Sequence, residues 1–238
     1  MQLLTQQPTI TVDAATGGYY FKGPITFGSA QKLKATVPPG SSLLFQSTGG
    51  RSEEAREIAR WIKSNGIELT IKGYCVSACA NYIAAVPHVQ WNQPVLLLFH
   101  GGGLQTYVQP CAQLAPCGAP GPTGATVTDF DREFGLNSNF VTFSGRAADE
   151  VLRRRGATDG ATRLPGLPSP YFWAPTAEEL ACFGIAAQVS SVVDFPVSPA
   201  AKKWWFTTAS LSSELQAELR AICQEVKPAV AHAAGQPL

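Results

Sequence analysis

The chain has 238 residues, of which 45% are hydrophobic and 15% are charged, so it can bury a sizeable core and is not globally disordered. Its formal net charge of +1 gives no basic field that would attract nucleic acid or an anionic membrane. The longest uncharged stretches are interrupted by proline, glycine and polar residues, which argues against a membrane span. We expect one large domain at this length.

The first 17 residues are expected to form an N-terminal extension. They include MQLLTQQPTITVDA, which lacks the basic and apolar regions of an intact signal peptide. The next segment, YYFKGPITFGSAQKLKATV, predicts a strand, a Gly-Pro turn, a short strand and a short helix. The sequence PPG at residues 38–40 then interrupts any regular element.

Strand and helix patterns alternate between residues 41 and 100. SSLLFQ predicts a buried strand, IELTIKG predicts a second strand that ends at Gly73, and residues 77–86 predict a helix. PVLLLFH is apolar throughout, as in strands buried on both faces of a parallel sheet. SEEAREIARWIKSNG predicts an amphipathic helix, whose apolar face comprises Ala55, Ile58, Ala59 and Ile62. The resulting βαβαβ pattern predicts an α/β fold with right-handed crossovers.

The pattern weakens after this segment. Residues 101–128 are dense in glycine, proline and alanine and predict a long loop. Residues 129–156 predict helical segments, most clearly at AADEVLRRRG, and APTAEELACFGI predicts a short helix. Residues 201–238 predict a C-terminal helix followed by a frayed tail.

The cysteines indicate whether the protein resides in an oxidising or a reducing environment. An even number of cysteines, two of them inside the Pro/Gly-rich loop, favours disulfides and an oxidising environment over reduced buried thiols. A bridge between Cys75 and Cys79 would hold the strand to the following helix, and zinc is disfavoured because no C-x-x-C spacing occurs. The disulfide candidates are Cys75 with Cys79, Cys111 with Cys117, and Cys182 with Cys223.

The stretch GYCVSACANYIAAV places Ser77 at a turn from a strand into a helix. Such a turn presents a side chain at the carboxyl edge of the sheet, where the free N–H groups of the helix also point. Acyl transfer needs both features, a nucleophile on a rigid element and donors for the developing oxyanion. A helix cap is an equally simple interpretation. The turn is not G-x-S-x-G, so the nucleophile elbow of the α/β-hydrolases does not apply.

Two further loops belong to the same predicted edge. His100 ends the buried strand that follows the Ser77 turn, whereas His88 lies in a loop and His232 in the tail, so His100 is the candidate base. Gly49 and Gly50 follow the first buried strand, where glycine backbone can approach a substrate and offer N–H groups. A tight turn and a structural histidine are the alternatives.

These residues resemble the Clp protease proteolytic subunit and its relatives of the ClpP/crotonase fold. The resemblance rests on LLFQSTGG, IELTIKGYCVSACANYIAAV, PVLLLFHGG and YFWAPTAEELACFGIAAQV, and it covers about residues 18–194 with a gap in the middle. It implies an α/β fold, a repeated ββα superhelix with a mostly parallel sheet flanked by helices, over a domain of residues 18–200. The site residues that it implies are Ser77 as the nucleophile, His100 as the base, and Gly49 or Gly50 together with Ala78 as oxyanion donors.

The third member of a catalytic triad has no direct counterpart in this sequence. The family has an aspartate just before the segment that corresponds to YFWAP, and no acid occupies that position here. Asp149 and Asp159 are the nearest acids upstream, and we take Asp159 provisionally. Ser169 is the alternative group that could orient His100.

The sequence therefore predicts a serine hydrolase that cleaves peptide bonds, with a peptide or protein substrate and without a metal or a cofactor. A catalytically degenerate binding or scaffolding protein of the same fold is the alternative, favoured by the missing aspartate. Acyl-CoA chemistry of the crotonase type is disfavoured because no CoA-binding surface is evident.

The form C-x-S-A-C is closest to ClpP-like proteins exported to the bacterial periplasm, so we expect a periplasmic or secreted protein with no ATPase partner. A homo-oligomer is compatible with the resemblance. A double ring is not expected, because a Pro/Gly/Cys loop stands where the family has the long helix that joins two rings.

Overall fold

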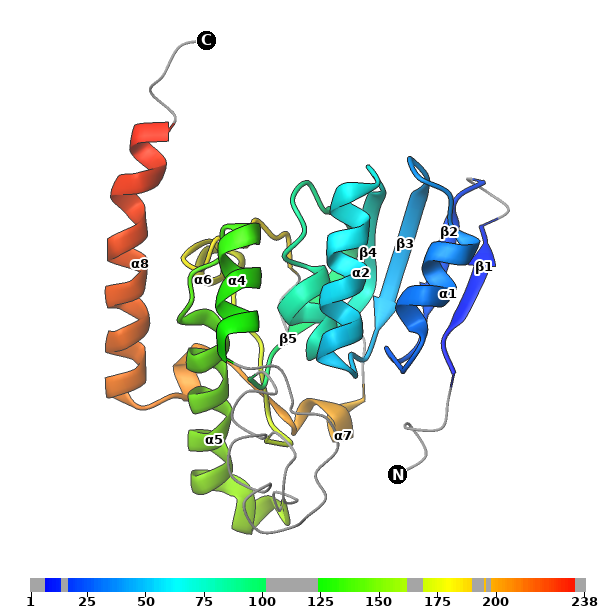
Figure 1. The fold of residues 1–238 in the computed structure, drawn as a ribbon. Helices are drawn as coiled ribbons and strands as arrows, with labels where there is room; N and C mark the ends of the chain where they lie inside the picture. Colours follow the sequence, from blue (N-terminus) through cyan, green and yellow to red (C-terminus); the bar gives the residue numbers. More distant parts are fainter. Residues whose placement is uncertain are drawn as a thin grey trace, which may run out of the picture.

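The structure of the protein, a computed structural model, describes residues 7–13, 17–101, 124–161, 169–189, 195 and 198–233. Its centre is a sheet in which strands follow one another in chain order, β1-β2-β3-β4-β5 (Figure 1). The first pair is antiparallel and the other three pairs are parallel. The strands are β1 (Thr9–Val12), β2 (Tyr19–Lys22), β3 (Ser42–Ser47), β4 (Glu68–Val76) and β5 (Gln90–Leu98).

Helices flank this sheet and extend the molecule beyond β5. Two very short parallel strands, β6 (Phe172–Trp173) and β7 (Trp205–Phe206), make a second sheet. The helices are α1 (Ser29–Thr36), α2 (Ser52–Ser64), the π-helix η2 (Cys79–Ile83), α4 (Gly124–Phe134), α5 (Phe140–Asp159), α6 (Ala177–Ala181), α7 (Pro199–Lys202), the 3₁₀-helix η4 (Thr208–Ser210) and α8 (Ser213–Ala233). The predicted class, α/β with a mostly parallel sheet flanked by helices, is confirmed. None of the helices within the described ranges has the length and apolar character needed to cross a membrane.

The predicted βαβαβ order between residues 41 and 100 is also confirmed, because β3, α2, β4, η2 and β5 follow in that order. The predicted apolar face of α2 is buried, with all four of its residues at most 1% exposed. The short strand predicted after the Gly-Pro turn does not form; Ile25 makes only an isolated parallel bridge to Gly50 there.

Three elements differ from the prediction. The N-terminal segment contributes β1, which the sequence pattern did not indicate. Gly73 does not end its strand: the register against β5 shifts between Lys72 and Gly73, and β4 then continues to Val76. The predicted helix of residues 77–86 is the shorter π-helix η2, a form that occurs mostly as a single turn and often at functional sites.

Aromatic side chains join the sheet to the C-terminal half. Phe99, directly after β5, packs edge-on against Phe140 of α5 at 4.9 Å between ring centroids, and Phe143 packs against Trp173 at 5.1 Å. The strand that precedes His100 is therefore fixed against both α5 and β6 by buried rings.

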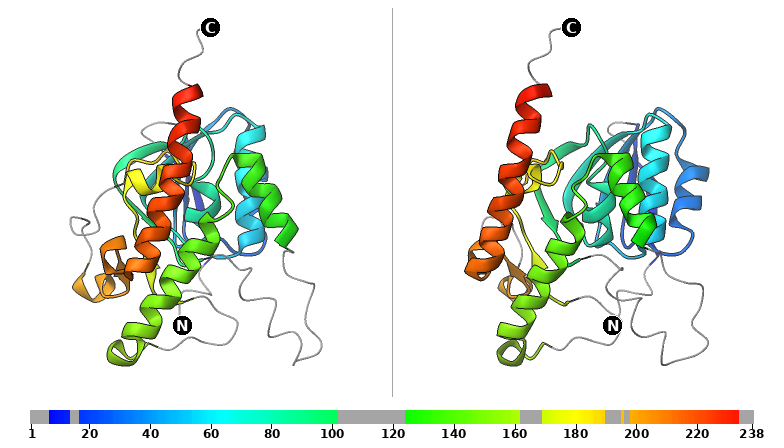
Figure 2. Two further views of the ribbon diagram at one scale, coloured as in Figure 1. Left: turned by 90° about the vertical axis from the view of Figure 1, so that its left-hand side faces the viewer. Right: turned by 60° about the vertical axis from the view of Figure 1, so that its left-hand side comes forward.

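The last helix is held to this half by covalent and polar links. A disulfide joins Cys182 to Cys223, with 4.7 Å between their Cα atoms. Helix α8 runs beside α5 (Figure 2), and the Glu150 carboxylate accepts hydrogen bonds from the N–H of Ser212 at 2.8 Å and its Oγ at 2.7 Å. Arg146 also forms an ion pair with Glu218.

Asp131 on α4 is a buried carboxyl group that should make stability depend on pH. It is 4% exposed, and burial raises its pKa from 3.8 to about 6 although the neighbouring Arg56 acts in the opposite direction. The folded state therefore holds this proton more tightly than the unfolded state does, so stability is lost as the pH rises toward the folded pKa.

We expect Asp131→Asn to raise the melting temperature near neutral pH by about 2–4 °C, the shift that about 1 kcal/mol gives at this chain length. The increase should be smaller at a pH close to 4, where the carboxyl group of the folded wild type is already protonated. Thermal unfolding at the two pH values measures this. Equal shifts at both, or a lower melting temperature at neutral pH, would contradict the assignment.

Candidate active site

Ser77 lies in a strained turn at the carboxyl end of β4. Its φ is 56°, a left-handed conformation that costs a residue other than glycine about 1–3 kcal/mol. The surrounding hydrogen bonds enforce it: the Ser77 N–H donates to Leu98 O at 2.8 Å, and the Asn81 N–H donates to Ser77 O at 2.8 Å. Such strain persists where the structure over-determines it, often at functional sites.

A disulfide encloses this turn. Cys75 at the end of β4 is bonded to Cys79 at the start of η2, with 5.2 Å between their Cα atoms. Both cysteines are fully buried. The bridge therefore ties the two ends of the Ser77 turn together, as the sequence predicted. Cys111 and Cys117 lie outside the described residues.

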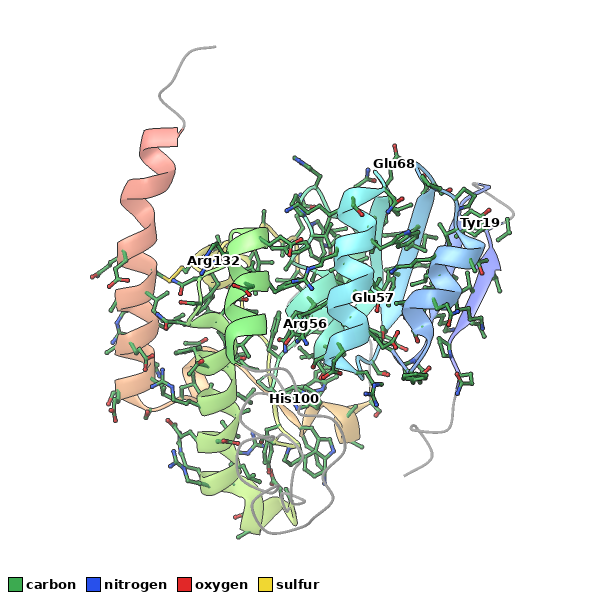
Figure 3. The ribbon with its side chains drawn as sticks, in the orientation of Figure 1. Tyr19, Arg56, Glu57, Glu68, His100 and Arg132 are labelled. Atoms are coloured by element: carbon green, nitrogen blue, oxygen red, sulfur yellow. A yellow bond between two sulfur atoms is a disulfide. The ribbon has the colours of Figure 1, made fainter. Side chains whose placement is uncertain are left out.

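His100 is placed to remove a proton from Ser77. Its Nε2 lies 2.6 Å from Ser77 Oγ, and its Nδ1 lies 2.9 Å from the backbone carbonyl oxygen of Ser169. Because a carbonyl can only accept, the proton resides on Nδ1, and Nε2 is left free to accept the hydroxyl proton of Ser77. Figure 3 shows His100 below α2, at the lower end of the sheet in that view.

The surroundings keep the imidazole neutral. Burial lowers the pKa of His100 from its ordinary value of 6.5, and the hydrogen bond to the Ser169 carbonyl opposes this shift. The ring of Phe172 lies 4.5 Å from the imidazole, at an angle of 35°, and supplies an apolar wall. A neutral imidazole at physiological pH is the form that a general base requires.

Asp159 does not orient His100, so its provisional place in a triad is wrong. Its Oδ2 accepts the hydroxyl hydrogen of Tyr171 at 2.6 Å and pairs with Arg155 at 3.1 Å. The Tyr171 hydrogen bond, together with Arg155, holds the pKa of Asp159 below its usual value. The second acid considered, Asp149, lines a surface hollow between α5 and α8. The group that contacts Nδ1 is the main-chain carbonyl of Ser169.

The Gly49–Gly50 loop lies against the Ser77 turn. A Cβ atom built on Gly49 would overlap the carbonyl oxygen of Val76 and would lie 2.7 Å from Ser77 Cβ and 2.9 Å from Ala78 N. The φ of Gly49 is 84°, which also favours glycine. The backbone of this loop and the backbone N–H of Ala78 are therefore neighbours.

The hydrogen bonds distinguish the two glycines. The Gly49 N–H donates to Ser47 Oγ at 3.0 Å, so this donor is already used. The N–H groups of Gly50 and Ala78 have no acceptor within the part of the chain that the structure describes. Ala78 stands in the first turn of its helix, where N–H groups have no intrahelical partner. Gly50 and Ala78 are the donors that an oxyanion could use.

The structure thus brings together Ser77, His100, Ala78 and the Gly49–Gly50 loop, all expected from the sequence. Ser169, the alternative orienting group expected from the sequence, does contact His100, but through its main-chain carbonyl, which the sequence could not indicate because every residue type offers such an oxygen. Sequence reasoning missed the fully buried Ser47, whose hydroxyl accepts the Gly49 N–H. The small STGG loop could have suggested this turn, since serine hydroxyls often bond to the backbone two residues on.

Comparison with models of known protein families gives no match, and comparison with curated proteins gives none either. The function of the site is therefore inferred from its geometry.

Proposed function

We propose that the protein is a serine hydrolase, similar to the ClpP-like peptidases, that cleaves peptide bonds. The observation that carries this proposal is the 2.6 Å contact between Ser77 Oγ and His100 Nε2, in a histidine whose other nitrogen is held by a main-chain acceptor. A helix cap alone would not require this contact. The strained φ of Ser77 gives independent support.

The geometry supports a two-step acyl transfer. His100 takes the Ser77 proton on Nε2 while Oγ attacks the carbonyl carbon, and the N–H groups of Gly50 and Ala78 bind the developing oxyanion. The imidazolium then donates its proton to the leaving amine as the carbon–nitrogen bond breaks. Water, deprotonated by His100, attacks the acyl-serine, and Ser77 recovers its proton as the acid product leaves.

The order of the strands supports the proposed ClpP/crotonase-like fold, and the disulfides support the proposed location. Strands β2 to β5 follow each other in chain order with helical crossovers, as successive units of a ClpP/crotonase-like superhelix would. Two disulfides are compatible with an oxidising compartment, and we propose a periplasmic or secreted location. An exported hydrolase would work without an ATPase partner.

A binding protein of the same fold is the second candidate. The observation that favours it is the partner of His100 Nδ1, a neutral carbonyl where serine proteases use a carboxylate. A carbonyl fixes the tautomer and the ring orientation but stabilises the imidazolium less than a negative charge does. Such a site could bind a peptide with little or no turnover.

A fluorophosphonate probe, which reacts with activated serines, separates the two candidates. We expect intact-mass spectrometry of the treated protein to show one adduct, and peptide mapping to place it on Ser77. The heat-unfolded protein is the control and should remain unlabelled. Absence of an adduct on folded protein would contradict the hydrolase and favour the binding protein.

The rate of labelling should depend on the protonation of His100. Because burial lowers the pKa of this histidine below 6.5, its neutral form persists to a lower pH than in an ordinary histidine. We expect the labelling rate to rise with pH, with a midpoint below 6.5, and to be level through neutral pH. A midpoint above that ordinary value would be inconsistent with a buried, neutral base.

A further inference from the structure

One short segment, residues 169–173, contacts His100 or its strand in three ways. The carbonyl of Ser169 accepts the Nδ1 hydrogen, and the Phe172 ring lies against the imidazole. Trp173 and Phe99 exchange two backbone hydrogen bonds, of 2.6 and 2.9 Å, directly before His100. The position of the candidate base therefore depends on where this segment lies.

The segment is in turn attached to α5. The Oγ of Ser169, a residue only 2% exposed, donates to the carbonyl of Ala148 at 3.0 Å and accepts the Tyr171 N–H at 3.3 Å. The side chain of Tyr171 is fully buried, and its hydroxyl donates to Asp159 at the last residue of α5. The hydroxyl of Tyr171 is thus a second attachment of the segment to the same helix.

Arg155 fixes the acceptor of this hydrogen bond. Its guanidinium pairs with Asp159 at 3.1 Å, lies 5.3 Å from the centre of the Tyr171 ring, and donates to the carbonyl of Lys203 at 3.0 Å. Burial, together with the Asp159 carboxylate, raises the pKa of Tyr171 to about 12. The hydroxyl therefore remains a donor over the whole physiological pH range.

We propose that Tyr171 and Asp159 are positioning residues for His100, which hold the Ser169 carbonyl at Nδ1 by securing the segment between them to α5. The expected effect on the labelling rate rests on the proposed function, whereas the expected effect on the position of His100 does not. Asp159, which the sequence placed in the triad, would then not contact His100 itself. It would influence the position of His100 indirectly, by accepting the hydrogen bond of Tyr171. A displacement of about 1 Å at a reacting group can lower a rate by about 10²-fold.

The kinetic test compares labelling rates of variants of the 238-residue chain. Tyr171→Phe keeps the ring but removes the hydroxyl, and Asp159→Ala removes its acceptor, so both should slow fluorophosphonate labelling by about 10- to 100-fold. Asp159→Asn keeps an oxygen that can accept the Tyr171 hydrogen, and it should retain most of the rate. Asp129→Asn removes an exposed carboxylate that is paired with Arg132 on α4, and it should leave the rate unchanged.

A measurement that does not need activity separates this inference from the proposed function. In protein labelled with ¹⁵N-histidine, the Nδ1–H proton of His100 should be protected from exchange in the wild type and in Asp159→Asn. It should exchange faster in Tyr171→Phe and in Asp159→Ala. Failure of the wild type to react with the probe would overturn the hydrolase while leaving this comparison intact.

Unchanged rates and unchanged exchange in folded Tyr171→Phe would overturn the positioning role. If Tyr171→Phe does not fold, Asp159→Ala and Asp159→Asn decide the matter, because both keep the tyrosine and both lose the ion pair with Arg155. Equal behaviour of these two variants would then exclude the proposed hydrogen-bond mechanism.

Discussion

Ser77→Ala is expected to abolish fluorophosphonate labelling and to lower the rate of any peptide hydrolysis by at least about 10³-fold. The hydroxyl oxygen of Ser77 is the atom that His100 Nε2 contacts, and alanine leaves no nucleophile in its place. The fold should persist, because β4, the disulfide around the turn and the backbone hydrogen bonds of residue 77 do not use this hydroxyl. Intact-mass spectrometry and circular dichroism of the same sample measure both outcomes.

Ser64→Ala is the matched control. Ser64 lies exposed at the end of α2, and among the residues that the structure describes its hydroxyl makes only local hydrogen bonds, to Trp61 O and to Asn65. Its removal should change neither labelling nor fold. His100→Ala should also lose labelling although Ser77 is intact, because the hydroxyl alone is a weak nucleophile. Labelling of Ser77→Ala at the wild-type level would show that the probe reacts elsewhere.

The candidate site was predictable from the sequence to the extent that it depends on sheet topology. Parallel strands end at a common edge, so the residues that follow β3, β4 and β5 had to come close together. The Gly49–Gly50 loop, Ser77 and His100 follow these three strands, and the structure brings Ser77 and His100 to 2.6 Å. The helical periodicity of α2 likewise sufficed to predict which of its side chains are buried, because its apolar residues form a single stripe that packs against the core.

Features that depend on backbone atoms or on distant contacts were not predictable. Gly73 suggested the end of a strand, but a shift in register allows β4 to continue, and local sequence does not encode that pairing. The partner of His100 is a carbonyl oxygen, for which no residue type is diagnostic. Asp159 was chosen because it is among the nearest acids upstream. In the structure its carboxylate accepts the hydrogen bond of Tyr171 and does not contact His100.

Gly49→Ala should have the second large effect, since it would act on both the stability of the fold and the reactivity of Ser77. The new Cβ would meet the Val76 carbonyl, Ser77 Cβ and Ala78 N, which all belong to the fixed turn that carries the nucleophile. Overpacking of this kind costs about 1–3 kcal/mol, in addition to the cost of a left-handed conformation. Displacement of an oxyanion donor lowers rates by about 10²–10³-fold, so labelling should fall by at least about 10²-fold.

Gly40→Ala separates the steric effect from the backbone effect. Gly40 has a φ of 74°, close to the 84° of Gly49, but a Cβ built on it meets no atom within 4 Å. The two variants therefore share the penalty of a left-handed alanine and differ in the contact with the Ser77 turn. Denaturant unfolding should show Gly49→Ala to be less stable than Gly40→Ala by about 1–3 kcal/mol, and only Gly49→Ala should lose labelling. Equal losses of stability together with full labelling in both would mean that the loop can move away from Ser77, and the Gly49–Gly50 backbone would then have no fixed place in an oxyanion site.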